Sequence, residues 1–180
     1  MKIKLLFVAF LIMVGCNNKK KADTKIGEKE ETSEIAVKEK DVELEIYDFE
    51  GLSSYLNKKD DKVYIINFWA TWCAPCVKEL PYFEEIGSKY KNENVEIILV
   101  SLDFPHLYDS KLKPYIKDKE LKSKVVALND DDMNTWIPKV SEDWSGAIPA
   151  TVIYKNDKRS FYEKSFTYEE LEKELKQFLN

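Results

Sequence analysis

Hydrophobic and polar residues follow patterns that change along this chain. In residues 42–47 apolar and acidic positions alternate with period two, which predicts a half-exposed strand, and residues 52–56 suit a short helix. Residues 63–69 form a nearly continuous apolar run, as expected for a strand buried on both faces of a parallel sheet. The pattern therefore predicts an edge strand, a helix and a central strand.

A helix and a further strand are expected next. Apolar residues recur there at three- and four-residue spacing, which predicts one helical stripe made of Cys76, Leu80, Phe83, Ile86 and Tyr90. We expect Pro81 to kink this helix, and residues 95–100 to form the next strand. Strand, helix and strand in this order make a right-handed crossover, whose helix begins at the carboxyl edge of the sheet, where ligands usually bind.

The second half of the chain predicts shorter elements. Residues 112–121 suit a helix and residues 125–128 a short strand, whereas we interpret residues 130–145 as a loop with helical turns. Residues 150–154 and 159–163 predict an antiparallel hairpin with a polar turn.

The chain closes with an amphipathic helix. Thr167 and Glu170 form a capping-box pattern just before its apolar stripe. With 44% hydrophobic and 13% aromatic residues in 180, the chain can build one sizeable core. We therefore expect one folded α/β domain at residues 41–180.

The first fifteen residues differ from the rest. Lys2 and Lys4 precede an apolar run at residues 5–14, which Gly15 ends, in the order typical of a cleaved signal peptide. The run is shorter than the about 20 residues that a membrane-spanning helix needs. We predict a signal peptide at residues 1–15.

Residues 13–16, Met-Val-Gly-Cys, resemble the bacterial lipoprotein box, with methionine where that pattern prefers leucine. The resemblance implies that Cys16 is lipidated and becomes the mature N-terminus. The alternative is an uncleaved anchor helix with an incidental cysteine, and both place the domain at a membrane on its exported side. Residues 17–40 are highly charged and lack aromatics, so we expect a disordered tether at 16–40.

Cys73 and Cys76 form a Cys-x-x-Cys pair, which suits a redox couple, half of a zinc site or a structural role. Zinc usually needs four ligands, and only the distant Cys16 and His106 remain. A redox couple is favoured because the start of a helix stabilises an anion through its dipole and free amides. Cys73, the outer sulfur, is then the nucleophile, and Cys76 resolves the mixed disulfide.

Residues 68–76, Phe-Trp-Ala-Thr-Trp-Cys-Ala-Pro-Cys, resemble the active-site signature of the thioredoxin superfamily. The following Glu79-Leu80-Pro81 is similar to its membrane-tethered branch, which includes the TlpA and ResA reductases. The resemblance covers residues 42–180. It implies a thioredoxin fold with a central mixed sheet flanked by helices, an N-terminal strand-helix extension and an insertion at residues 102–148.

The resemblance also implies roles around the pair. Ala74 and Pro75 form the active-site turn. Asn67 replaces the buried aspartate that ordinary thioredoxins use for proton transfer, so Glu79 is the candidate proton acceptor; the alternative is an ordinary surface glutamate. Pro149 corresponds to the cis-proline opposite the disulfide, where Ile148 would face the cysteine and pair with substrate; the alternative is a trans proline.

Three tryptophans are candidates for an apolar rim that binds a partner. Buried aromatic residues more often belong to a core, so we favour only Trp72, over Trp136 and Trp144. We expect His106 to be a surface residue.

These features predict a thiol–disulfide oxidoreductase that reduces exported proteins, with electrons from a membrane thiol donor; cytochrome c maturation is one role of the branch. The alternative is a copper chaperone or a non-catalytic adaptor. We expect no metal or other cofactor, and the charge of −5 does not suggest nucleic-acid binding. We expect a lipid-anchored monomer in the bacterial cell envelope, with its domain in the periplasm or extracytoplasmic space.

Overall fold

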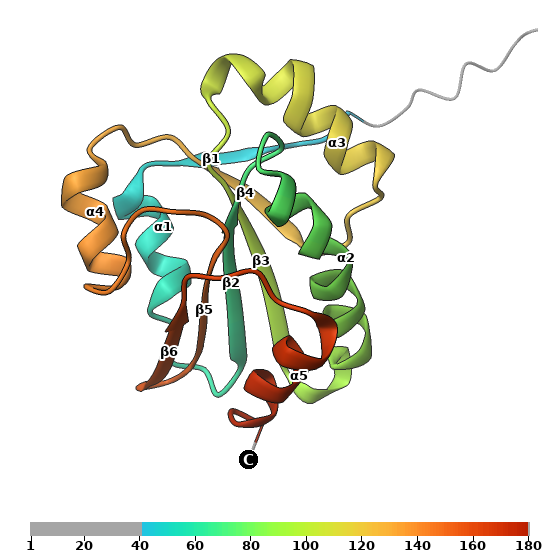
Figure 1. Cartoon of the computed structure of the whole chain (residues 1–180), viewed down its shortest axis with the longest axis vertical. Helices are drawn as coiled ribbons and strands as arrows, with labels where there is room; N and C mark the ends of the chain where they lie inside the picture. Colours follow the sequence, from blue (N-terminus) through green and yellow to red (C-terminus); the bar gives the residue numbers. More distant parts are fainter. Residues whose placement is uncertain (1–40, 180) are drawn as a thin grey trace, which may run out of the picture. The chain divides into compact units, whose positions relative to one another are not determined.

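A six-stranded sheet organises the residues that the computed structural model describes, 41–179 (Figure 1). The strand order is β1-β4-β3-β2-β5-β6. The strands are β1 (Glu45–Tyr47), β2 (Val63–Trp69), β3 (Val95–Ser101), β4 (Lys124–Leu128), β5 (Ala150–Lys155) and β6 (Lys158–Tyr162).

The helices connect these strands. They are α1 (Phe49–Leu56), α2 (Ala74–Lys89), α3 (Lys113–Asp118), α4 (Met133–Val140) and α5 (Tyr168–Lys176). Short turns lie between them, namely the 3-10 turns η1 (Lys91–Glu93) and η2 (Pro105–Leu107) and the π turn η3 (Tyr108–Leu112).

The sheet is mixed, as expected. β2 pairs in parallel with β3 and antiparallel with β5, while β4 runs parallel to both β1 and β3. β6 pairs antiparallel with β5 through a two-residue turn in which Asn156 has a φ of 54°. Asparagine tolerates this left-handed conformation, so the predicted hairpin is confirmed.

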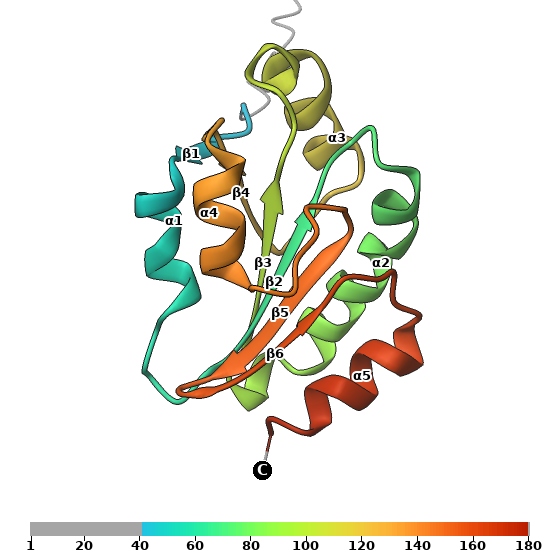
Figure 2. The same cartoon turned by 60° about the vertical axis from the view of Figure 1, so that its left-hand side comes forward.

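β2 is central and fully buried, as its apolar run predicts. Its side chains alternate between two cores. Val63, Ile65 and Trp69 pack with α2 and α5, whereas Tyr64, Ile66 and Phe68 pack with α1 and α4. Figure 2 shows these helix pairs on opposite faces of the sheet. Because both faces are covered, the strand has no polar side facing solvent.

Several boundaries differ from the expected ones. β1 begins only at Glu45, and α1 begins at Phe49 because Asp48 caps it by accepting a hydrogen bond from Gly51 N. The expected helix at 112–121 is shorter: α3 begins after η3 and ends at Asp118. α2 continues through Pro81, and the kink there stays a prediction.

Residues 130–145 contain a regular helix, α4, where we expected a loop with helical turns. Trp136 and Val140 of α4 are buried against the same face of the sheet as α1. The helix was hard to recognise because it is short and includes Pro138. Its formation depends on this tertiary packing.

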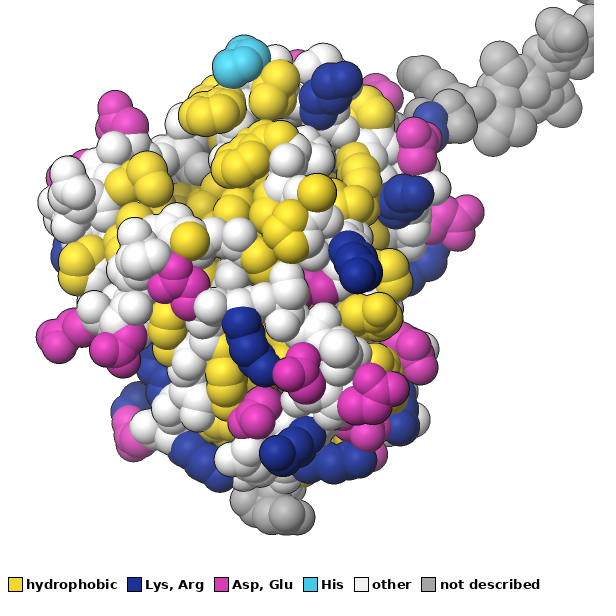
Figure 3. Space-filling view, in the orientation of Figure 1, with side chains coloured by type: hydrophobic (Ala, Val, Ile, Leu, Met, Phe, Trp, Pro, Cys, Tyr) yellow, Lys and Arg dark blue, Asp and Glu magenta, His cyan; other side chains and the backbone are white. Residues whose placement is uncertain are grey.

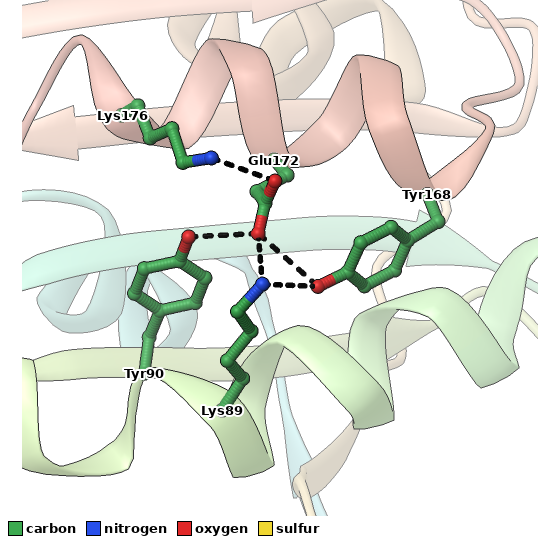
Figure 4. Close-up of polar contacts among 5 residues, drawn as sticks. All are labelled: Lys89, Tyr90, Tyr168, Glu172 and Lys176. Atoms are coloured by element: carbon green, nitrogen blue, oxygen red, sulfur yellow. Dashed lines mark hydrogen bonds and ion pairs between the residues drawn. The ribbon is translucent and has the colours of Figure 1, made fainter.

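α5 begins with the predicted capping box, in which Thr167 accepts from Glu170 N and Glu170 accepts from Thr167 N. A polar cluster then joins α5 to the end of α2 (Figure 4). Glu172 accepts from Lys89 and Tyr90 at the end of α2, and from Tyr168 and Lys176 on its own helix. The buried stripe of α5 and this cluster dock the helix on α2.

The predicted signal peptide, Cys16 and the tether lie outside the described residues. Within residues 41–179 no helix has the length and apolar character needed to cross a membrane.

Candidate active site

Cys73 and Cys76 lie where β2 ends and α2 begins. Cys73 is the N-cap of α2, its backbone N–H donates to Ala70 O at 3.1 Å, and its Sγ lies 3.3 Å from Cys76 N. The two sulfurs are bonded at 2.03 Å. Pro75 occupies the first turn of the helix, where a missing N–H has no intrahelical partner to lose. The Ala74-Pro75 turn therefore brings both sulfurs to the start of the helix.

The two sulfurs differ in their access to solvent. Cys73 retains an exposed fraction of 6%, whereas Cys76 is completely buried in the core on the α2 face of the sheet. The first turn of α2 carries no acidic residue that would oppose an anion there. A partner molecule can therefore reach Cys73 far more easily than Cys76.

The Ile148–Pro149 peptide bond is cis, as the resemblance implies. The carbonyl oxygen of Ile148 lies 3.7 Å from Cys73 Sγ. Both residues immediately precede β5, which pairs with β2. The pairing of these two strands brings the Ile148 backbone against the disulfide across 75 residues of sequence.

Glu79 is 1% exposed, so it is not the surface glutamate of the alternative interpretation. Its carboxylate accepts hydrogen bonds from Asn67 Nδ2 at 3.1 Å and from Phe166 N at 2.6 Å. Burial raises the pKa of Glu79 to about 7, although both hydrogen bonds act to lower it. A carboxyl group with this pKa can accept or release a proton near neutral pH.

Asn67 connects this carboxylate to β5. It is fully buried, and its Nδ2 also donates to Thr151 Oγ1 at 3.1 Å, the residue directly opposite it in the ladder. Its Oδ1 has no hydrogen-bond partner among the described residues. Thr151 and Phe166 could not be recognised as site residues from the sequence, because only strand pairing and the docking of α5 bring them to Glu79.

Asp103 is a second buried acid, and the sequence did not single it out as a site residue. It accepts hydrogen bonds from Thr71 N at 3.0 Å, Thr71 Oγ1 at 2.5 Å and Ser101 Oγ at 2.8 Å. Thr71 stands two residues before Cys73, so Asp103 anchors the turn that presents the cysteine. The only hint in the sequence is a polar residue just past the end of a buried strand.

The three tryptophans separate into surface and core. Trp72 is 55% exposed and stacks on the equally exposed Phe104 with 6.3 Å between ring centroids. Trp136 and Trp144 are buried among the side chains of the α4 face, so Trp72 is the exposed one of the three. His106 is exposed, as expected, and stacks on Phe104.

No group of three or more His, Cys, Asp or Glu side chains is placed to hold a metal ion in the described part of the chain.

Relatives with similar sequences are named thiol-disulfide oxidoreductases. A thiol-disulfide oxidoreductase ResA of Bacillus thuringiensis is 40% identical over 80 residues, which cover 44% of this chain and 44% of that protein. The ResA of Oceanobacillus iheyensis is 48% identical over 48 residues, 27% of this chain and 25% of that protein. The chain thus matches less than half the length of these relatives.

Solved structures share the fold at low identity. A secreted thiol-disulfide isomerase from Corynebacterium glutamicum superimposes with a TM-score of 0.57 and 17% identity, covering 71% of this chain and 74% of that one. A thioredoxin-family thiol:disulfide interchange protein from Chlorobium tepidum gives 0.54 and 18%, covering 71% and 85%. These neighbours support the thioredoxin fold.

The model of the AhpC/TSA family matches residues 35–159, well over half of the sequence. This match includes the Cys73–Cys76 turn and the cis Ile148–Pro149 bond. The chain therefore belongs to the AhpC/TSA family, within the thioredoxin superfamily.

Proposed function

We propose that this protein is a thiol–disulfide oxidoreductase that exchanges disulfides with exported proteins. The observation that carries the proposal is the Cys73–Cys76 disulfide at the start of α2, in which Cys73 keeps an exposed fraction of 6% and Cys76 is completely buried. The names of the relatives support the same chemistry. A helix start favours the thiolate, which is the form that attacks a disulfide.

The reaction proceeds in two exchanges. The Cys73 thiolate attacks a substrate disulfide, forming a mixed disulfide while the other substrate sulfur leaves as a thiolate and takes up a proton. Cys76, after losing its proton, attacks Cys73 and releases the second substrate thiolate. The protein ends with its Cys73–Cys76 disulfide, and two electrons have passed to the substrate.

Glu79 is the proposed acceptor of the Cys76 proton. Its pKa of about 7 leaves a substantial fraction ionised at neutral pH, and it lies on the same helix three residues after Cys76. Asn67 and Phe166 N hold the carboxylate in place.

The substrate is proposed to bind along the Ile148–Pro149 segment. The Ile148 backbone adjoins Cys73 and can pair with an extended substrate strand, while Trp72 offers an apolar contact on the exposed side.

Direction and location are inferred from the resemblance to the membrane-tethered branch. We infer net reduction, with electrons from a membrane thiol donor, and cytochrome c maturation as one candidate role. Lipidation at Cys16 would hold a monomeric domain, residues 41–180, outside the cytoplasm. A tether at residues 16–40 would let it reach substrates near the membrane.

Trapping tests the exchange mechanism. Cys76→Ser should accumulate mixed disulfides with exported proteins through Cys73, because no second thiol can resolve them. Cys73→Ser is the matched control and should trap none. The proposal is wrong if Cys76→Ser traps nothing; stoichiometric copper binding by the reduced protein without exchange would favour the chaperone alternative.

A redox titration tests the direction of net electron flow between this protein and its substrates. A reductase should have a potential near that of thioredoxin, about −270 mV, whereas a potential near −120 mV is that of a strong oxidant and contradicts net reduction.

A further inference from the structure

An apolar pocket of about 350 Å³ lies beside the disulfide. This Trp72 pocket is lined mainly by Trp72, Phe104, Leu128, Met133, Trp136 and Ile148. Its volume falls at the lower end of the range of ligand pockets, about 300–1,000 Å³. On the face of the molecule drawn in Figure 3, hydrophobic side chains gather over the upper part, while charged side chains dominate the lower part.

The Trp72 pocket is continuous with the proposed reaction centre. Trp72 is the chain neighbour of Cys73, and Ile148 contributes both to the pocket lining and to the carbonyl 3.7 Å from Cys73 Sγ. A chain that pairs with the Ile148 backbone therefore passes the pocket within a residue or two of its reacting cysteine.

Three side chains give the pocket an exposed apolar wall. Trp72, Phe104 and Met133 are 55%, 57% and 44% exposed. Met133 begins α4, the helix that replaces the expected loop, so the insertion at residues 102–148 supplies much of this wall. Exposed large apolar side chains gathered in one place mark a binding surface more often than scattered ones do.

The charged side chains that line the pocket are all acidic. Asp103, Asp130 and Asp131 contribute to its lining, and no lysine, arginine or histidine does among the described residues. Asp103 and Asp130 already accept hydrogen bonds within the domain. Asp131 is exposed and forms no hydrogen bond or ion pair in residues 41–179, so its carboxylate can pair with a cation on a bound partner.

We propose that the Trp72 pocket selects, among disulfide-bearing proteins, an extended segment that carries an apolar side chain and a lysine or arginine next to the reacting cysteine. The apolar side chain fills the pocket between Trp72 and Met133, and the basic side chain pairs with Asp131. This proposal rests on the proposed exchange function and names the class of its substrate.

Matched peptides test the proposal on the full-length protein. Three short peptides are identical except for the dipeptide beside their cysteine, which is Leu-Lys, Leu-Glu or Ser-Lys. In each peptide the cysteine forms a mixed disulfide with 2-mercaptoethanol. The measurement is the second-order rate constant for oxidation of the reduced protein. Bis(2-hydroxyethyl) disulfide, small and neutral, measures basal exchange.

The Leu-Lys peptide should react about three- to tenfold faster than the Leu-Glu peptide at low salt, as expected for one exposed ion pair against one repulsive pair. The difference should shrink at 1 M salt, where the screening length is about 3 Å. Asp131→Lys should reverse the order of the two peptides, and Met133→Ser should abolish the preference for Leu-Lys over Ser-Lys.

Glu93→Lys is the matched control, because it makes the same change of charge at an exposed position in η1, beside the amino end of β3. It should leave all three rates and basal exchange unchanged. Equal rates for all peptides with normal basal exchange would overturn the pocket proposal and leave the exchange function intact. A preference for Leu-Glu would overturn it too, and no reaction with any disulfide would overturn both.

Discussion

Buried carboxyl groups distinguish this site at the scale of single residues. Glu79 and Asp103 are both almost inaccessible, yet each is satisfied by donors that come from distant parts of the chain. Glu79 places a carboxyl group on the same helix as Cys76, and Asp103 anchors the turn before Cys73. Unpaired burial of either carboxylate would cost several kcal/mol, so their donors are part of the design of the site.

Glu79→Gln should change how stability depends on pH. The pKa of Glu79 is raised from 4.5 to about 7, so the folded protein holds a proton that the unfolded chain releases between these values. Its contribution to the free energy of unfolding therefore falls by about 3 kcal/mol as pH rises from 4.5 to 7, then stays level. In urea titrations of the oxidised protein, the free energy of unfolding of the variant relative to that of wild type should therefore rise by about 3 kcal/mol between pH 4 and pH 8.

Glu85→Gln provides the control for this experiment, since Glu85 is exposed on the same helix. The pH dependence found for Glu79→Gln is compared with that of this variant, which removes a carboxylate from an exposed position. A constant difference between Glu79→Gln and wild type would show that the carboxyl is not protonated preferentially in the fold.

α5 is the element that links the end of the chain to the site. The residue before its N-cap, Phe166, donates its backbone N–H to Glu79, and Glu172 binds α5 to the end of α2. The position of the donor therefore depends on how α5 begins and docks. The capping box is the local feature that determines where the helix starts.

Thr167→Ala should lower the free energy of unfolding by about 1 kcal/mol, because the first turn of α5 loses the side-chain acceptor for Glu170 N. Thr135→Ala in α4 is the control, since Thr135 is exposed and its hydroxyl accepts or donates no hydrogen bond among the described residues. Thermal or urea unfolding measures both. Equal effects of the two substitutions would mean that the cap does not stabilise α5.

At the scale of the whole molecule, two cores enclose the sheet, one on each face. The disulfide lies just beyond the carboxyl end of the central strand β2, whose residues are all buried. The disulfide is therefore held rigidly, because neither β2 nor α2 can shift without disturbing one of the cores.

The proposed domain boundary predicts that a chain beginning at Asp41 folds as well as one beginning at Asn17. Their melting temperatures should agree within about 2 °C, the size expected for surface changes in a domain of this length. Differential scanning calorimetry measures the difference. A much lower value for the shorter chain would place part of the domain before residue 41.

Much of the fold was predictable because its determinants are local. The apolar run of β2, the stripe of α2, the hairpin turn and the capping box each depend on neighbours within a few residues. α4 was missed because a short helix with an internal proline has little intrinsic stability and forms only against the sheet.

By itself, the sequence determined the order of the strands and of the helices other than α4, and it placed the pair Cys73–Cys76 at a helix start. Periodicity, caps and spacing are properties of adjacent residues. Only the tertiary structure decided that Trp72 is exposed while Trp136 and Trp144 are buried, and that Glu79 meets Phe166 across 87 residues. Those outcomes depend on which strands pair and which helices cover them. Burial and long-range hydrogen bonding are set by that packing, which no local pattern records.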